Sequence, residues 1–265
     1  MRPHDHIGWA FAGPAEFTAL ARPFLAEGAA LGEKLMYVAP DPDPAAVADL
    51  ASPDALQVVS IAEVYGSSGM VDALSQRATF SGALAQALGE GYTGIRVAAD
   101  NTPLVTDDER LAAWIEWEIV ADRFMSENLV TGLCAFDREK VDVDRLRHLA
   151  SLHPLSTAAQ PAPQFRLLAD SGTLYVEGEI DAFAVGQLER ALRVLPPQTG
   201  VRIDLAAVTL RGRKVMADLG GLADAGVRVT IRGEPAVLGK LRGAGQPPSE
   251  RLILQEAAPA LGAVG

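Results

Sequence analysis

Short apolar runs alternate with segments of helical periodicity along the first half of the chain. Apolar runs bounded by turn residues predict buried strands, and apolar positions three or four residues apart predict helices. In residues 14–28, one helical face carries Phe17, Leu20, Ala21, Phe24 and Leu25. The expected strands are residues 6–11, 34–39, 56–61, 94–99 and 130–136, and the expected helices are residues 14–28, 44–50, 80–89, 107–127 and 142–152. This alternation predicts an α/β fold with a largely parallel sheet and helices on both faces.

An uncharged segment separates this pattern from a second one. Residues 154–163 (PLSTAAQPAP) have the composition of an inter-domain linker. We therefore expect a first domain at residues 1–153, a smaller α/β domain at residues 164–258 and a tail at residues 259–265. In the second domain, the expected strands are residues 165–169, 174–177, 201–208, 227–231 and 252–254, and the expected helices are residues 182–195, 214–225 and 235–243.

The net charge of −11 is concentrated in the first half of the chain. Residues 1–155 hold 23 acidic and 11 basic side chains, whereas residues 156–265 hold 11 acidic and 12 basic ones. This asymmetry supports two modules with different surfaces. It argues against nucleic acid as a partner of the first module, because phosphates would be repelled. Alternatively, the acidic surface serves only solubility.

Composition bounds the class of protein and its compartment. Hydrophobic residues make up 49% of the chain and charged residues 22%, which is ordinary for a globular protein. No apolar run reaches the roughly 18 residues of a membrane span, and no basic stretch followed by an apolar one begins the chain, so we expect a soluble protein without membrane association. The single cysteine, Cys134, cannot form an internal disulfide and fits a reducing compartment such as the cytoplasm.

Three collinear segments of the second domain resemble a STAS domain, the fold of anti-sigma-factor antagonists. They are residues 174–182 (LYVEGEIDA), 201–209 (VRIDLAAVT) and 226–235 (GVRVTIRGEP). The resemblance covers about residues 164–258. It implies a module that binds a regulatory protein of the anti-sigma factor or kinase type.

A basic turn stands where the STAS resemblance places a phosphorylated serine. In that family, a partner kinase modifies a serine in the turn that follows the strand ending here near Thr209. This chain has Arg211, Arg213 and Lys214 in that turn, and no Ser or Thr within it. Phosphorylation would add about two negative charges, whereas three cations do the opposite, so phosphorylation control is not expected. Either the three cations dock an acidic partner or an anion, or they are solvated charges at a decayed site.

Five collinear segments of the first domain resemble MEDS, the sensory domain of methanogen and methylotroph regulators. They are residues 5–11 (DHIGWAF), 23–28 (PFLAEG), 31–38 (LGEKLMYV), 91–97 (GYTGIRV) and 133–137 (LCAFD). The resemblance spans roughly residues 4–153. It implies a degenerate recombinase-like P-loop α/β fold that senses small, hydrocarbon-derived molecules and often accompanies STAS or kinase modules in bacterial regulators.

The first strand is not followed by a phosphate-binding loop. Such a loop ends in Lys and then Ser or Thr, because its amides and the lysine hold the phosphates. Residues 12–16 (AGPAE) have no Lys, Ser or Thr in that register, and Glu16 would repel phosphate. We therefore expect no ATP hydrolysis, no cofactor and no enzymatic activity.

A ligand of such a sheet is expected at the carboxyl ends of the strands. Residues at these ends include Phe11, Asp41, Ser60 and Asp137, each of which can equally be a turn or cap residue. Residues 64–79 are expected to form a loop that could serve as a lid. The candidate ligand-binding residues are His6, Tyr65, Ser67, Ser68, Arg96 and Asp100.

Metal binding and stacking on a ligand are less well supported. The polar side chains considered as metal ligands are His4, His6, Glu116, Glu118 and Asp122. Nothing fixes a third ligand beside the histidines, and His148 and His153 are distant in sequence, so no metal site is expected. Cys134 falls within an apolar strand and is expected to be a buried, inert thiol. Trp114 and Trp117 lie one helical turn apart and are expected to pack.

Together these patterns predict a non-catalytic signalling regulator. The first domain would sense a small apolar or organic molecule or a protein signal, and the second would bind an anti-sigma factor or kinase-type protein. A homodimer is compatible with both roles. An enzyme would require residues such as Tyr65, Cys134, His6 and Glu118 to converge in the fold. The alternative is a structural scaffold that oligomerises and binds no small ligand.

Overall fold

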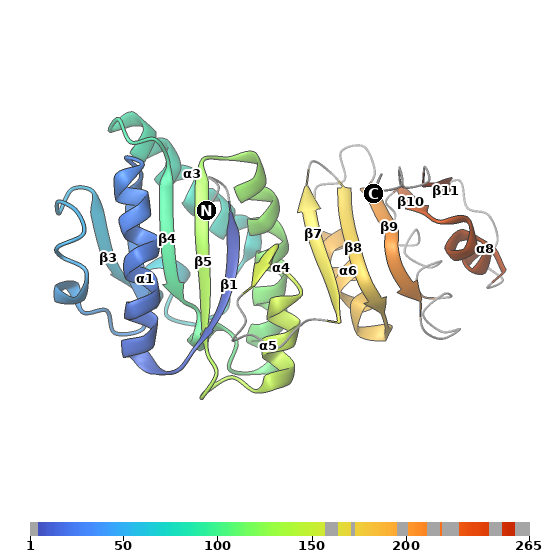
Figure 1. The fold of residues 1–265 in the computed structure, drawn as a ribbon, viewed down its shortest axis with the longest axis horizontal. Helices are drawn as coiled ribbons and strands as arrows, with labels where there is room; N and C mark the ends of the chain where they lie inside the picture. Colours follow the sequence, from blue (N-terminus) through green and yellow to red (C-terminus); the bar gives the residue numbers. More distant parts are fainter. Residues whose placement is uncertain are drawn as a thin grey trace, which may run out of the picture. The chain divides into compact units, whose positions relative to one another are not determined.

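The chain divides into two compact units, residues 1–163 and residues 164–265. The computed structural model describes residues 5–156, 164–170, 173–194, 201–210, 218, 228–243 and 251–257. Both units are α/β, the first with a parallel sheet and the second with a mixed one (Figure 1). The predicted fold class is thereby confirmed at this level. Within the described residues, no helix combines the length and apolar character needed to cross a lipid bilayer.

The sheet of the first unit has six strands, all paired in parallel. Its strands are β1 (His6–Phe11), β2 (Lys34–Ala39), β3 (Leu56–Ser60), β4 (Ile95–Asp100), β5 (Val130–Asp137) and the short β6 (Leu155–Ser156). Their order across the sheet is β3-β2-β4-β5-β1-β6. The first strand of the chain, β1, therefore lies between β5 and β6, the last two strands of this unit in the sequence. The central strands are buried along their whole length, because helices cover both faces of the sheet.

The helices of the first unit begin at identifiable caps. They are α1 (Gly13–Ala30), α2 (Ile61–Tyr65), α3 (Ala73–Gly89), α4 (Asp108–Glu127) and α5 (Val143–Ala150), with short 3-10 turns at η1 (Pro44–Ala46) and η2 (Thr102–Leu104). Asp72, Asp107 and Asp142 accept hydrogen bonds from the first-turn amides of α3, α4 and α5. In Figure 1, α1 covers one face of the sheet, and α3 and α4 lie behind it.

The two faces of this sheet have different chemistry. Ile7 and Phe11 of β1 point towards α1 and join an apolar core with Phe17, Leu25 and Leu133. Because side chains alternate along a strand, His6 on β1 and Cys134 on β5 point to the opposite face, where α4 packs. That second face therefore combines apolar packing with ionisable groups.

The structure differs from the predicted elements mainly between β3 and α3. Residues 64–79 were expected to form a loop, but Tyr65 ends α2 and α3 begins at Ala73. Ser60 and Glu63 form a reciprocal capping box that starts α2, and Asp72 caps α3 through the amide of Ser75. Only residues 66–72 are left as a connection. The helix expected at residues 44–50 is reduced to the 3-10 turn η1.

The second unit has a five-stranded sheet in the order β11-β10-β9-β8-β7. Its elements are β7 (Phe165–Asp170), β8 (Thr173–Ile180), α6 (Ala182–Val194), β9 (Val201–Leu210), β10 (Val229–Gly233), α8 (Pro235–Gly243) and β11 (Leu252–Glu256). Strands β7 and β8 pair antiparallel, and the remaining pairs are parallel. The helix expected at residues 214–225 lies outside the described residues, apart from Asp218.

A buried arginine joins α1 to β4. Arg96 is fully buried, and its Nε donates to Glu33 Oε2 at 2.5 Å while Nη1 lies 3.1 Å from Glu27 Oε2. The guanidinium also lies 4.8 Å from the centre of the Phe24 ring. A Cβ atom at Gly28 would come within 2.6 Å of the Arg96 side chain, so only glycine lets α1 approach this closely. The arginine cannot move away without leaving its charge unpaired in the interior.

We predict that Gly28→Ala destabilises the first unit, although alanine favours helices. The overpacking should cost about 1–3 kcal/mol and outweigh a gain in helix propensity of about 1 kcal/mol or less. Gly82→Ala in α3 is the matched control, because nothing lies within 4 Å of its added Cβ atom and only the propensity gain applies. Urea denaturation followed by tryptophan fluorescence measures both variants, since all three tryptophans lie in the first unit. Equal changes in stability at the two glycines, or a Gly28→Ala variant that is more stable than the unchanged chain, would contradict this account.

Candidate functional site

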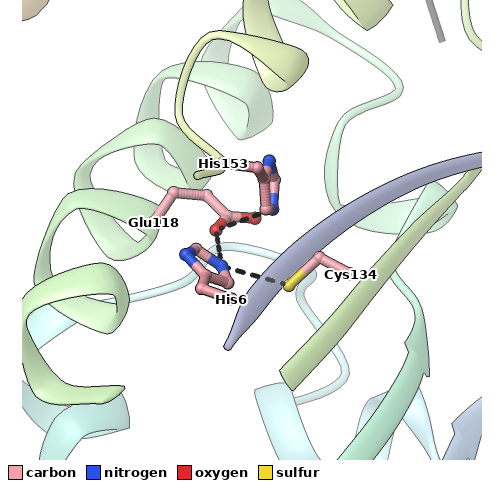
Figure 2. A group of neighbouring side chains, drawn as sticks. All are labelled: His6, Glu118, Cys134 and His153. Atoms are coloured by element: carbon pink, nitrogen blue, oxygen red, sulfur yellow. Dashed lines mark hydrogen bonds and ion pairs between the residues drawn. The ribbon is translucent and has the colours of Figure 1, made fainter. Parts of the chain in front are cut away.

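Four ionisable side chains from distant parts of the sequence converge inside the first unit (Figure 2). We call His6, Glu118, Cys134 and His153 the buried cluster. His6 Nε2 lies 2.9 Å from Glu118 Oε2 and 3.6 Å from Cys134 Sγ. His153 Nε2 lies 3.4 Å from the same Glu118 oxygen. The side chains of Glu118 and His153 are completely buried, and that of His6 is 1% exposed, so the cluster is shielded from solvent.

Each member of the buried cluster is placed by a different element. Gly8 of β1 pairs with Cys134 of β5, which puts His6, two residues before Gly8, on the same face as the thiol. Helix α4 supplies Glu118 from the side that faces the sheet. His153 follows the end of α5 and precedes the edge strand β6, and its ring centre lies 4.4 Å from that of His6.

The outer nitrogens of both histidines are held by second contacts. His6 Nδ1 lies 3.2 Å from Asp122 Oδ1, and His153 Nδ1 lies 2.7 Å from the carbonyl oxygen of Leu149. A carbonyl oxygen only accepts hydrogen bonds, so His153 Nδ1 carries a proton. The neutral ring of His153 then presents the lone pair of Nε2 to Glu118. These contacts fix the orientation of the rings within the buried cluster.

Burial and mutual charge set the protonation of the buried cluster. Burial acts to lower the pKa of His6, but its contacts with Asp122, Cys134 and Glu118 outweigh burial and hold that pKa well above its ordinary value. Burial lowers the pKa of His153 to about 4. Burial opposes ionisation of Glu118, yet the two histidines hold the pKa of this carboxyl below its ordinary value. In the chain by itself, the cluster at neutral pH therefore contains a cationic His6, a neutral His153 and an ionised Glu118.

The arrangement around Cys134 resembles a nucleophile with its base, but the thiol is poorly suited to attack. His6 stands between Cys134 and Asp122, as a base stands between a nucleophile and an orienting carboxylate. Burial, with the charge of Glu118, raises the pKa of the Cys134 thiol to about 11, and the residue is 7% exposed within β5. The predicted buried, unreactive character of Cys134 agrees with these properties.

Aromatic side chains line the apolar surroundings of the buried cluster. Tyr65 is buried and packs edge-on against Trp114, with ring centres 5.4 Å apart. Burial, with the charge of Glu118 nearby, raises the pKa of Tyr65 well above its ordinary value. Trp117 stacks on Phe80 at 5.6 Å between ring centres. The prediction that Trp114 and Trp117 pack is confirmed, and Tyr65 packs with them rather than facing solvent.

The structure does not bring the other ligand-binding candidates to the buried cluster. Arg96 lies near the amino end of β4 in its ion pairs with Glu33 and Glu27. Asp100 lies at the carboxyl end of the same strand, where it accepts the amide hydrogen of Thr102 and where burial raises its pKa. Side chains alternate along β4, so Arg96 and Asp100 point to the same face of the sheet as Ala98. Ala98 belongs to the apolar core beneath α1, and this is therefore the face that α1 covers.

Ser67 and Ser68 also lie apart from the buried interior. Both are exposed in the turn after α2, where the Ser68 carbonyl accepts a hydrogen bond from Arg110. Strand-end residues behave as caps: Ser60 caps α2, and Asp137 accepts the amide of Glu139. The predicted site at the carboxyl ends of the strands and the buried cluster are therefore different places in the fold.

Carboxylates of the chain itself occupy the turn in which a phosphate loop would lie. The amide of Ala12 donates to Glu16 Oε2 at 2.9 Å, and the amide of Gly13 lies 3.5 Å from Asp137 Oδ1. Arg138 pairs with both oxygens of Glu16 at 3.0 Å. Amides that would receive a phosphate are thus engaged by acidic side chains, in keeping with the sequence of this turn.

Three members of the buried cluster, His6, Glu118 and Cys134, are sequence-predicted candidates, although only the first two were considered as metal ligands. His153 was set aside because of its distance along the chain, and this inference was wrong in space. The helical spacing of Glu118 and Asp122 was the available signal, because both fall on the buried side of α4 beside Trp114. Carboxylates on an apolar helical face require buried partners. His4 lies outside the described residues.

We predict that Glu118→Ala strongly destabilises the first unit. Removing one partner of a buried ion pair leaves His6 and His153 facing a void, at a cost of about 3–5 kcal/mol. Glu109→Ala in the first turn of the same helix is the control, because this carboxylate is exposed and its loss should cost less than about 1 kcal/mol. Urea denaturation followed by tryptophan fluorescence compares them, and similar losses would show that the buried carboxylate has no special role.

The partner-binding candidates Arg211, Arg213 and Lys214 lie outside the described residues. Strand β9 ends at Leu210, the residue that precedes Arg211 in the sequence. The segments that resemble a STAS domain form β8, β9 and β10, which are neighbours in the sheet.

Comparison with protein families gives one match. Residues 5–154 match the family model described as MEDS, the methanogen/methylotroph, DcmR sensory domain. The match takes in all four residues of the buried cluster and ends before the second unit. No curated protein and no solved structure matches the chain. The family match covers more than half of the sequence, and the chain therefore belongs to the MEDS family of sensory-domain proteins.

Proposed function

We propose that this chain is a non-catalytic signalling regulator. Its first unit senses a small molecule or a protein signal, and its second unit is a STAS-like module that binds a regulatory protein of the anti-sigma factor or kinase type. The observation that carries the proposal is the match of a sensory family over residues 5–154. The buried cluster supports it, because groups whose pKa values are shifted by burial and by specific charged partners cluster at functional sites.

The absence of catalysis rests on the chemistry of the groups described above. A nucleophilic mechanism requires an accessible thiolate, whereas Cys134 is buried with a raised pKa. A phosphoryl-transfer mechanism requires amides and a lysine at the α1 N-terminus, whereas Glu16 and Asp137 take up that position. We infer that the recombinase-like ancestry implied by the resemblance survives as a scaffold for binding.

The topology of the second unit supports the STAS assignment. An antiparallel hairpin, β7 and β8, is followed by parallel strands with intervening helices. Asp181 caps α6 by accepting the amide of Ala184 at 2.9 Å, the role that its place after the GEI segment indicates. Asp204 pairs with Arg232 across β9 and β10, so two of the three resembling segments also share a side-chain contact.

We predict that a signal molecule raises the unfolding temperature of the first unit. A ligand at 100 times its Kd stabilises the folded state by about 2.7 kcal/mol, which shifts the midpoint by several degrees. The measurement is a thermal scan of tryptophan fluorescence with short organic acids, apolar metabolites and nucleotides. A response to nucleotides alone would contradict the absence of a phosphate site. Lack of any response would favour an oligomerising scaffold.

We also predict that the basic turn contributes to partner binding. Replacing Arg211, Arg213 and Lys214 with Gln should weaken capture of the regulatory partner and reduce the salt dependence of binding, because fewer charges are screened. The matched control replaces three exposed cations elsewhere in the second unit with Gln. They are Arg193, Lys240 and Arg242. Pull-downs at several salt concentrations compare the two triple variants, and equal weakening would assign the effect to net charge rather than to this turn.

A further inference from the structure

We propose that the buried cluster is a four-coordinate site for a divalent transition metal ion of the zinc type. Its donors are His6 Nε2, Glu118 Oε2, Cys134 Sγ and His153 Nε2, all within 4.8 Å of one another. Two imidazoles, a carboxylate and a thiolate are the donors that zinc and its neighbours take in proteins. The proposal does not rest on the sensory function, since the ion would be held whether or not it is the signal.

The distances between donor atoms fit one ion among them. Zinc–nitrogen and zinc–oxygen bonds of about 2.0–2.1 Å and a zinc–sulfur bond of about 2.3 Å, arranged tetrahedrally, place donor atoms roughly 3.3–3.6 Å apart. His153 Nε2 and Glu118 Oε2 are 3.4 Å apart, and His6 Nε2 and Cys134 Sγ are 3.6 Å apart. The separation of 2.9 Å between His6 Nε2 and Glu118 Oε2 must open slightly, and the wider donor separations, which reach up to 4.8 Å, must close by about 1 Å around an ion.

The outer contacts of the histidines are those of metal ligands. A ligating imidazole usually donates its second N–H to a carboxylate or a backbone carbonyl, which turns the lone pair of the other nitrogen to the metal. His6 meets Asp122 in this way, and His153 meets the Leu149 carbonyl. With His153 Nδ1 protonated, its Nε2 lone pair faces the lone pairs of Glu118 Oε2. A cation between these two acceptors converts a repulsive contact into two bonds.

Binding requires a specific exchange of protons. On binding, the Cys134 thiol and the Nε2 nitrogen of His6 each release one proton to solvent, and His6 keeps the proton that faces Asp122. A divalent ion then meets one thiolate and one carboxylate, so the ion and its four ligands together carry no net charge. Neutrality matters because both histidines and Glu118 are at most 1% exposed, and net charge is costly in such an interior.

The ligand set indicates a closed site. Four protein donors fill a tetrahedral zinc ion, whereas catalytic zinc keeps a position for water or substrate. The bound ion would tie β1, β5 and α4 to the residue that follows α5. Its occupancy therefore bears on how firmly the α5–β6 segment is fixed to the sheet.

The test uses the full chain without an affinity tag, because tags bind zinc themselves. We expect about one equivalent of zinc by elemental analysis after purification or after addition of zinc, with a rise in unfolding temperature that a chelator reverses. Cobalt should replace zinc and give both the visible bands of a tetrahedral ion and a sulfur-to-cobalt charge-transfer band. Failure to bind zinc or cobalt would overturn the proposal and leave the buried cluster as a network of protons and charges.

Variants locate the ion. Cys134→Ser should abolish the sulfur-to-cobalt band, and His153→Gln should weaken zinc binding about 100-fold or more. Asp122→Asn changes only the outer contact of His6, so it should weaken zinc binding about 10- to 100-fold and keep the sulfur-to-cobalt band. His148→Gln is the matched control on the same helix as the Leu149 carbonyl and should bind like the unchanged chain. Unchanged binding in Cys134→Ser and His153→Gln, or equal loss in His148→Gln, would place the ion elsewhere. Circular dichroism of each variant shows whether lost binding reflects lost folding.

The experiments test the metal site and the sensory function independently of each other. Stoichiometric metal with no thermal response to any signal molecule would leave the metal site standing and count against the sensor. A response to a signal molecule in a chain that binds no metal would do the reverse. The cobalt spectrum of the unchanged chain needs no variant, so the proposal stays testable even if every substitution in the buried cluster prevents folding.

Discussion

The burial of charge beneath α4 is the constraint on which the first unit depends. Moving a carboxylate or a protonated imidazole into a dry interior costs several kcal/mol for each ion unless partners are placed with good geometry. Glu118 obtains one cationic partner, His6 of the first strand, and the neutral ring of His153, from the end of the domain, lies 3.4 Å away. The folded position of β1, α4 and the segment after α5 is therefore tied to a single carboxylate.

A second buried charge, on the other face of the sheet, is compensated differently. Arg96 lies between two carboxylates and the ring of Phe24, and the approach of α1 at Gly28 leaves no space around it. The charge of Arg96 is thus balanced by carboxylates that contact it directly, which fits a structural role. The buried cluster instead gathers donors whose lone pairs converge, which is the arrangement that a cation completes. The contrast explains why one charged site on this sheet is assigned to stability and the other to binding.

Sequence patterns predicted most strands closely, because strands buried on both faces are continuous apolar runs that turn residues delimit. They failed over residues 73–79, where α3 has few large apolar side chains and Asp72 is its main start signal. The convergence of His6, Cys134 and His153 could not be predicted, since it depends on which strands become neighbours. Strand order is a long-range property, and β1 enters the sheet between β5 and β6 rather than beside β2.

His153 connects the buried cluster to the end of the first domain. The sensory family match ends at residue 154, so His153 stands at the border of the domain, immediately before β6 and the segment that leads to the second unit. Strand β6 pairs with β1 over only two residues, a weak attachment by itself. The ring of His153 contacts the rings of His6 and Phe136, and these contacts help to fix that border. Because His153 belongs to the buried cluster, a change in the charge of the cluster acts directly on the residue that stands just before this weakly attached strand.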